Sequence, residues 1–348
     1  MALSKIDTTN MIEDVPQSKL DNNINFRNII INGGMDLAQR GTSATGINST
    51  SQYNTVDRFE MNVNGMGVFT QTQSTDVPSG QGFSNSMKLD CTTADASPAA
   101  SDYLIFRQKV EGQNLQYLKK GTSSAESLTA SFWVKSNKTG TYICELSDSD
   151  NTRTISKSYT ISSADTWEKK TITFDGDTTG AFDNDNARSL DLNFWLGAGS
   201  IYTSGTLQTS WGSTNSANRS VGGINLADST SNEWYITGVQ LEAGTTASDF
   251  EFLPHDVNLL RCQRYYWKYL SDHWCVNYND DAVSPSNKRA IIMFPTTMRA
   301  APSVTFSFNN TGTATGTQFS SVDAITLYNN AVAGSAYVND GSEYDSEL

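Results

Sequence analysis

The sequence is poor in the residues on which catalytic and metal sites most often depend. Its 348 residues include only 2 histidines, His255 and His273, and neither stands near a nucleophile motif such as Gly-x-Ser-x-Gly. The 4 cysteines follow no zinc-module spacing, and we expect them to be reduced thiols. Paired carboxylates of the glycosidase type are defined by their separation in space, which a sequence does not reveal. We predict that the protein is not an enzyme.

Positive charge and long apolar runs are also scarce. Lys and Arg number 24 against 37 Asp and Glu, which gives a formal net charge of −13 and a pI near 4.6. Because no basic stripe is present to neutralise phosphates, we expect no binding to nucleic acid. No apolar run is long enough to span a bilayer, and residues 1–17 lack the apolar core of a signal peptide. We expect synthesis in a cytoplasm and no membrane insertion.

What the sequence does contain, over residues 27–253, is a long series of short alternating runs separated by Gly, Asn, Asp and Ser clusters. This pattern is typical of a β-sandwich or jelly roll. Successive side chains of a strand point to opposite faces, so alternation predicts two core-facing sets. These are Leu128, Ala130, Phe132 and Val134, and Leu190, Leu192, Phe194 and Leu196. A last strand at residues 234–241 would carry four side chains on one side: Tyr235, Thr237, Val239 and Leu241.

After residue 253 the period changes from two to a helical one. Residues 254–272 are predicted to contain a short helix with Asp256 as its N-cap and a 3-4-3 spaced seam, formed by Leu259, Cys262, Tyr266 and Tyr269. So short a helix is marginal alone, and its seam needs a partner, either other copies of the helix or its own domain. Residues 273–348 return to β alternation. The predicted fold class is mainly β: a jelly-roll β-sandwich, a short helix and a small C-terminal β domain.

Several segments carry a resemblance to a known family. Residues 27–41 read RNIIINGGMDLAQRG and residues 55–59 read TVDRF. Together they resemble the opening of a carbohydrate-binding-module-like β-sandwich that recurs in tail fibres and related virion proteins of tailed bacteriophages. The resemblance continues in family order through QNLQYL at 113–118, LTASFWVKS at 128–136, DTWEKKTITF at 165–174, LNFWLG at 192–197, WYITGVQLEAG at 234–244, RCQRYY at 261–266 and FPTTMRAAP at 294–302.

This resemblance implies a virion protein that assembles in the host cytoplasm and forms a homotrimer. It favours residues 254–272 as the trimer junction. It also favours residues 1–26 as an attachment segment for other virion proteins, although a frayed terminus is an equal interpretation. The family supplies no fixed catalytic or metal residues.

Two tryptophans are the first candidates for ligand binding. Trp133 and Trp195 lie on the polar faces of strands whose other faces are aliphatic, and Trp195 is accompanied by Asp191 and Asn193. An aromatic ring among such groups can stack on a pyranose while its neighbours bond the hydroxyls. The alternative is that loops, the N-terminal segment or another subunit cover this face.

The loop at residues 200–212 is the second candidate, because Tyr202 and Trp211 stand there among Ser, Thr and Gly. Loops on a rigid sandwich often carry binding residues, but in trimeric fibres they also make contacts between subunits. Both interpretations remain open.

A structural Ca²⁺ is the one cofactor that the sequence suggests. Asp183 and Asp185 lie in the run DNDN, and a second run, DSDN, spans residues 148–151; both offer clustered oxygen ligands. Neither run fits an EF-hand, and a solvated turn is the alternative.

Together these features predict a homotrimeric virion fibre subunit, a tail fibre, that recognises the host surface by binding a glycan. The alternative is a purely structural virion component without a receptor, such as a capsid-attached fibre, a decoration protein or a tail collar part. The same sandwich serves both purposes.

Overall fold

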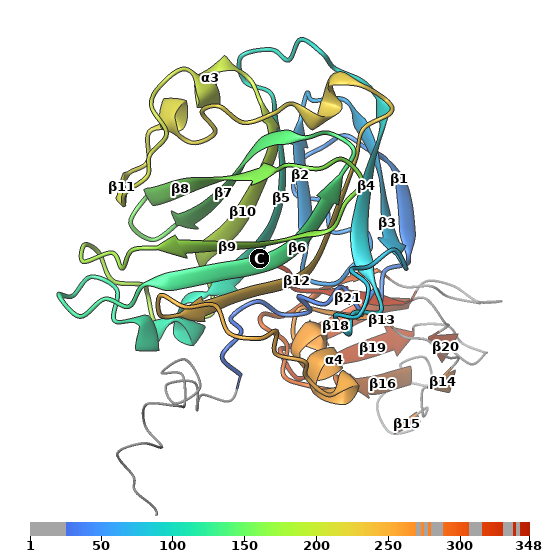
Figure 1. The fold of residues 1–348 in the computed structure, drawn as a ribbon. Coiled ribbons are helices and arrows are strands. Elements are labelled where there is room, and N and C mark those ends of the chain that lie inside the picture. Colours follow the sequence, from blue (N-terminus) through green and yellow to red (C-terminus); the bar gives the residue numbers. More distant parts are fainter. Residues whose placement is uncertain are drawn as a thin grey trace, which may run out of the picture.

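Two six-stranded antiparallel sheets pack face to face in the computed structural model, which describes residues 26–268, 273–274, 278–279, 288–305, 315–329, 337–338 and 342–348 (Figure 1). The first sheet has the order β1 (Ser43–Ile47), β3 (Val68–Ser74), β4 (Ser86–Thr93), β12 (Glu233–Ala243), β6 (Leu128–Ser136) and β9 (Glu168–Phe174). The second has the order β11 (Gly212–Ser213), β8 (Arg153–Ile161), β7 (Gly140–Asp148), β10 (Arg188–Ala198), β5 (Tyr103–Glu111) and β2 (Glu60–Asn64). The predicted mainly-β sandwich is confirmed. No helix within the described residues has the length and apolarity needed to cross a membrane.

A single apolar core fills the space between the two sheets. The sets predicted from alternation on β6 and β10 are all buried in it. Aromatic rings join the two layers: Phe132 of β6 meets Phe194 of β10 edge to face at 5.0 Å, and Trp234 of β12 meets Phe106 of β5 in the same way at 5.7 Å. Period-two alternation therefore predicted these core-facing residues correctly.

Strand β12 departs from simple alternation at Gly238. Its register with β6 shifts between Thr237 and Gln240, and Gly238 adopts a φ of +61°. Before this bulge the core residues are Trp234 and Ile236; after it they are Val239 and Leu241. The prediction that Tyr235, Thr237, Val239 and Leu241 share one side is wrong, because one extra residue reverses the facing of every residue that follows.

The segment that opens the family resemblance closes one end of the sandwich along β12. The amide of Ile29 donates to the carbonyl of Leu241 at 2.9 Å, and the amide of Val239 donates to that of Gly33 at 2.9 Å. A Cβ at Gly33 would lie 2.0 Å from the carbonyl oxygen of Val239, so only glycine allows this approach.

Helix α4 (His255–Gln263) is shorter than the sequence predicted. The helix begins at His255 with Pro254, not Asp256, as its N-cap. The chain has already entered strand β13 (Tyr266–Lys268) at Tyr266, and Tyr269 lies outside the described residues. Of the predicted seam, Leu259 and Cys262 pack against Ile31, Leu37 and Tyr265 of the same chain. The helix thus packs on its own domain, and the trimer junction at residues 254–272 stays a prediction.

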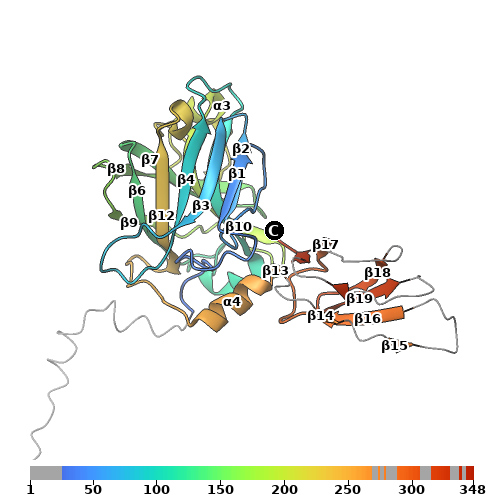
Figure 2. The same cartoon turned by 90° about the vertical axis from the view of Figure 1, so that its right-hand side faces the viewer.

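The C-terminal strands lie beyond α4, at the side of the sandwich (Figure 2). Strand β13 pairs with β21 (Glu343–Asp345), which pairs with β17 (Ser303–Thr305). A second small sheet contains β15 (Tyr278–Asn279), β16 (Lys288–Met293), β19 (Ala324–Asn329) and β18 (Thr315–Ser320), while β14 (His273–Trp274) pairs with β20 (Tyr337–Val338). The apolar centre of this region consists of Ile292, Phe294, Met298, Ile325 and Tyr344.

Gly238→Ala is expected to destabilise the sandwich more than Gly80→Ala. Both glycines have left-handed φ values, +61° and +75°, but a Cβ at Gly238 would come within 2.5 Å of the Phe83 ring, whereas nothing lies within 4 Å of one at Gly80. We expect a loss of about 1 kcal/mol at Gly80 from backbone strain, and about 2–3 kcal/mol at Gly238 from strain plus overpacking. Urea unfolding of the two variants checks this, and equal losses would contradict the role given to the bulge.

Candidate functional site

The outer face of the second sheet carries three of the predicted binding residues, but it is covered. Trp195 is only 1% exposed and forms a small apolar layer with Ile105, Ile143 and residues of the following loop, among them Tyr202. The Tyr202 ring lies 5.4 Å from that of Trp195. Trp195 is therefore a packing residue beneath this loop, which corrects the prediction of an open aromatic platform at this position.

A polar row crosses the same face beside Trp195. Five residues stand directly opposite one another on adjacent strands: Glu60, Arg107, Asn193, Glu145 and Ser156. Arg107 pairs with Glu60 at 2.6 Å, and the Asn193 amide donates to Glu145 at 2.9 Å. Most polar groups of the row thus find their partners within the row itself, so Asn193 acts here as a structural residue.

Two further arginines pair with acidic residues of this face, one in the row and one beside it. Arg219 pairs with Glu145 at 2.5 Å, and Arg188 pairs with Asp191, whose side chain is fully buried. Asp191 consequently has no free carboxylate oxygen facing solvent. The polar residues predicted around Trp195 do lie close together, as expected. However, they pair with one another and with arginines of the protein, so they are not open to a ligand.

The other two predicted aromatics lie apart from this layer. Trp211 packs on the main core, and its Nε1 donates to the carbonyl of Asp175 at 2.7 Å. Trp133 is half-buried on the outer face of the first sheet, opposite Thr237 and Lys169 on the neighbouring strands. Of the aromatic residues singled out from the sequence, Trp195 and Tyr202 therefore pack together, whereas Trp133 and Trp211 lie elsewhere.

The acidic runs serve as turns. The amide of Asp183 donates to the Asp150 carboxylate at 2.9 Å, and the Asp185 carboxylate accepts from the amide of Ala187 at 2.9 Å. Within the described part of the chain, no group of three or more His, Cys, Asp or Glu side chains could hold a metal ion. Asp183 and Asp185 thus belong to no such group, and the structural Ca²⁺ stays a prediction.

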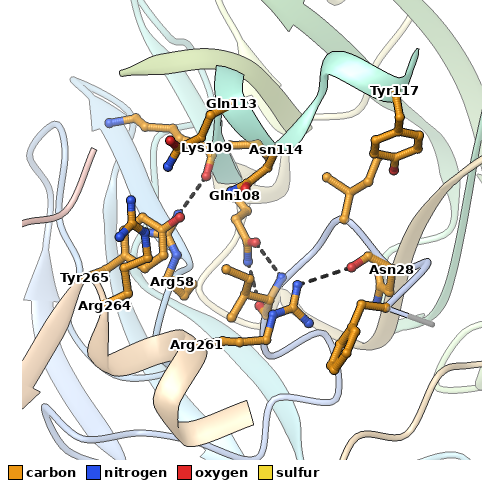
Figure 3. A pocket seen from close by; sticks show the side chains of 14 residues that line it. Asn28, Arg58, Gln108, Lys109, Gln113, Asn114, Tyr117, Arg261, Arg264 and Tyr265 are labelled. Carbon is orange, nitrogen blue, oxygen red and sulfur yellow. Dashed lines mark hydrogen bonds between the residues drawn. The ribbon is translucent and has the colours of Figure 1, made fainter. Parts of the chain in front are cut away.

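A cavity of about 400 Å³ opens instead where the N-terminal segment meets α4 and the two 3-10 turns η1 (Gly112–Asn114) and η2 (Gln116–Leu118) (Figure 3). We call it the basal pocket. Its walls come from elements far apart in the sequence: Asn28 and Ile31 of the N-terminal segment, Gln108 of β5, and Arg261 of α4. This volume lies within the ~300–1,000 Å³ typical of small-molecule sites.

Among the described residues that line the basal pocket, all the charged ones are cations, and three of them pair with carboxylates of the protein. The Arg264 guanidinium donates to both oxygens of Glu111, at 2.8 and 2.7 Å, and the Tyr265 hydroxyl also donates to Glu111. Burial alone would raise the pKa of Glu111, but these hydrogen bonds from Arg264 and Tyr265 hold it below its ordinary value. Arg58 and Lys109 have partners as well, in Glu347 and Glu60.

Arg261 is the fourth cation and differs from the others. Among the described residues no carboxylate lies within 4.0 Å of its guanidinium, and its single hydrogen bond is a long one, 3.3 Å to the carbonyl of Asn28. The side chain is half-buried, and burial lowers its pKa. In Figure 3 it reaches from α4 into the middle of the pocket.

The rim of the basal pocket is aromatic and polar. Phe26 is 55% exposed and Tyr117 is 42% exposed. Neither the Tyr117 hydroxyl nor the Asn114 amide makes a hydrogen bond with the described residues. Burial raises the pKa of Tyr117 to about 12, so its hydroxyl is neutral at ordinary pH and can donate or accept.

Most of these residues belong to the motifs of the family resemblance, but the sequence did not predict that they lie around one pocket. Ten of the fourteen lining residues fall in the segments 27–41, 55–59, 113–118 and 261–266 that carry the family resemblance. The available signal was this set of separate motifs. Only the tertiary structure shows that they surround one pocket.

Comparison with known proteins gives fold-level similarity. No protein-family model matches the sequence, and no curated protein matches it. The structure is similar to the enzymatically active domain of tailspike protein 4 of bacteriophage CBA120, with a TM-score of 0.34 and 15% identity over 62% of this chain and 21% of that one. This chain thus spans about a fifth of the tailspike chain.

Two carbohydrate-binding modules are also similar. One is TmCBM61 in complex with β-1,4-galactotriose, with a TM-score of 0.30 and 11% identity over 62% of this chain and 99% of that one. The other is the family 11 module of Clostridium thermocellum in complex with a mixed-linked tetrasaccharide, with a TM-score of 0.29 and 13% identity over 59% and 98%. All three TM-scores are below 0.5, so function must be argued from the residues of this chain.

Glu111→Gln is expected to destabilise the wall of the basal pocket in a pH-dependent way. The folded pKa of Glu111 is lowered, so its contribution is present above its unfolded pKa, near 4.3, and is lost as pH falls through the folded value. We expect the variant to lose about 2–3 kcal/mol at pH 7, because Arg264 and Tyr265 lose a charged acceptor. The difference from the wild type should shrink at pH 3–4 in denaturant titrations; a gap that stays constant would contradict this role.

Proposed function

We propose that the protein is a glycan-binding subunit of a phage virion fibre, and that the basal pocket holds a sugar residue of the glycan. The observation that carries this proposal is the combination of a 400 Å³ cavity with exposed rings at its rim and unused hydrogen-bonding groups beside them. Sugars are bound by this combination, because a ring covers the C–H face while polar groups bond the hydroxyls.

Tyr117 and Asn114 are suited to these two tasks. The exposed ring of Tyr117 can stack on a pyranose, and its hydroxyl and the Asn114 amide can bond sugar hydroxyls without breaking any existing hydrogen bond. A ligand therefore gains these bonds without the cost of displacing a protein partner.

The lining residues favour binding over cleavage. Glycosidic hydrolysis normally needs two carboxyl groups that flank the bond. Among the described lining residues there is no Asp or Glu, and the nearby Glu111 is already engaged by Arg264. We therefore propose a binding role without catalysis.

The virion location rests on the sequence resemblance. In a trimeric fibre three basal pockets would act together, and linked copies raise the effective affinity by orders of magnitude where geometry allows simultaneous contact. Weak single sites would then suffice for adhesion to a host surface. The N-terminal residues 1–26 would serve attachment to other virion proteins.

Tyr117→Ala is expected to weaken glycan binding about tenfold or more, as the loss of one stacked ring corresponds to about 1.4 kcal/mol or more. Tyr117→Phe should retain most of the affinity if stacking dominates. Binding would be measured on an array of bacterial surface polysaccharides. Phe252→Ala is the matched control, because it removes a ring that is 54% exposed and lies outside the pocket.

Other outcomes would redirect the proposal. If Trp133→Ala abolished binding while Tyr117→Ala retained it, the site would lie on the outer face of the first sheet. If the wild-type oligomer bound no glycan and no host cells, a structural virion role would be favoured.

A further inference from the structure

The charge balance of the basal pocket implies something about its ligand. Four cations are found among the described residues that line the pocket, and Arg58, Lys109 and Arg264 each have a carboxylate partner in the protein. Arg261 has none among the described residues. The chain as a whole carries a net charge of −13, so an unpaired, half-buried cation is not explained by a general excess of positive charge.

Leaving Arg261 in this state is unfavourable. A guanidinium loses hydration when it is partly buried, and one long hydrogen bond to the carbonyl of Asn28 replaces little of what water supplied. Burial, the largest influence, lowers its pKa, and Arg58 acts in the same direction, whereas Cys262, Glu251 and Tyr265 raise it without offsetting the burial. An anion bound in the pocket would relieve both effects.

We propose that the basal pocket selects an anionic sugar residue, whose carboxylate or phosphate group pairs with Arg261. The inference rests on the proposed glycan-binding function and names the class of sugar. A guanidinium presents two parallel N–H groups that match the two oxygens of such an anion. The rest of the sugar would contact the Tyr117 ring and the Asn114 amide at the rim. We expect one anionic group per bound sugar, because Arg261 is the one cation without a carboxylate partner among the described lining residues.

The test compares sugars that carry an anionic group with an uncharged sugar of similar shape. Wild-type protein would be titrated by calorimetry with methyl glucuronide, with its uncharged methyl ester and with glucose 6-phosphate. Acetate and inorganic phosphate serve as anions without a sugar. We expect at least one anionic sugar to bind about tenfold tighter than the ester, and this preference to weaken as salt is raised.

The variant is Arg261→Gln. We expect it to lose the preference for the anionic sugar while it retains binding of the neutral ester, because the aromatic rim is unchanged. Lys169→Gln removes the same charge from an exposed position of β9 outside the pocket, and should keep the wild-type preference. Unfolding midpoints of both variants check that they fold. We expect little loss of stability in Arg261→Gln, because Arg261 makes one long hydrogen bond with the described residues.

Each other result overturns a distinct claim. Equal binding of the charged sugar and its ester by the wild type, or a preference that survives in Arg261→Gln, would overturn the anionic selectivity and leave glycan binding intact. Binding of acetate or phosphate as tight as that of the anionic sugars would show that the sugar contributes nothing, which would overturn both proposals and identify a simple anion site. If none of these probes bound while neutral polysaccharides did so in a Tyr117-dependent way, only the inference about charge would fail.

Discussion

The region around the basal pocket depends on one buried cation, Arg58. Its side chain is 1% exposed, its guanidinium pairs with Glu347 and donates to the Lys109 carbonyl at 2.7 Å, and it lies 3.4 Å from the centre of the Tyr265 ring. Burial alone would lower the pKa of Arg58, but Glu347 raises it above its ordinary value. Breaking such a pair costs about 3–5 kcal/mol, because the remaining charge stays buried. One side chain thus joins the second sheet, the segment after α4 and the last residues described.

Two polar regions of this chain differ in whether their polar groups already have partners within the protein. On the outer face of the second sheet, Glu145 accepts from both Asn193 and Arg219, and Asp191 is covered by Arg188. Little capacity for a ligand remains, so this layer holds strands together. In the basal pocket Arg261 keeps its charge without a carboxylate partner among the described residues. Unused bonding capacity beside an accessible cavity is the physical reason why we propose ligand recognition there.

The fold was largely predictable where local rules act alone. Alternation on β6 and β10 identified core residues such as Phe132 and Phe194, because a strand surrounded by regular neighbours keeps its period of two. It failed on β12, where Gly238 adds a bulge that the sequence marks only as an ordinary glycine. The helix prediction overran Gln263, since pairing with β21 draws Tyr266 into a strand despite its helical spacing. Tertiary pairing overrides local pattern at such positions.

The sequence by itself predicted a mainly-β sandwich, gave an excess of acidic over basic residues, and carried the motifs on which we base the proposed virion role. These follow from composition, periodicity and motif order, all of which are local or additive. Only the tertiary structure decided which residues line the basal pocket. Trp195 was predicted to stand on an open polar face and Arg261 was not singled out, yet a loop covers the first, and the second lines a pocket without a carboxylate partner among the described residues. Exposure and charge pairing arise from segments far apart along the chain, so no local pattern contains them.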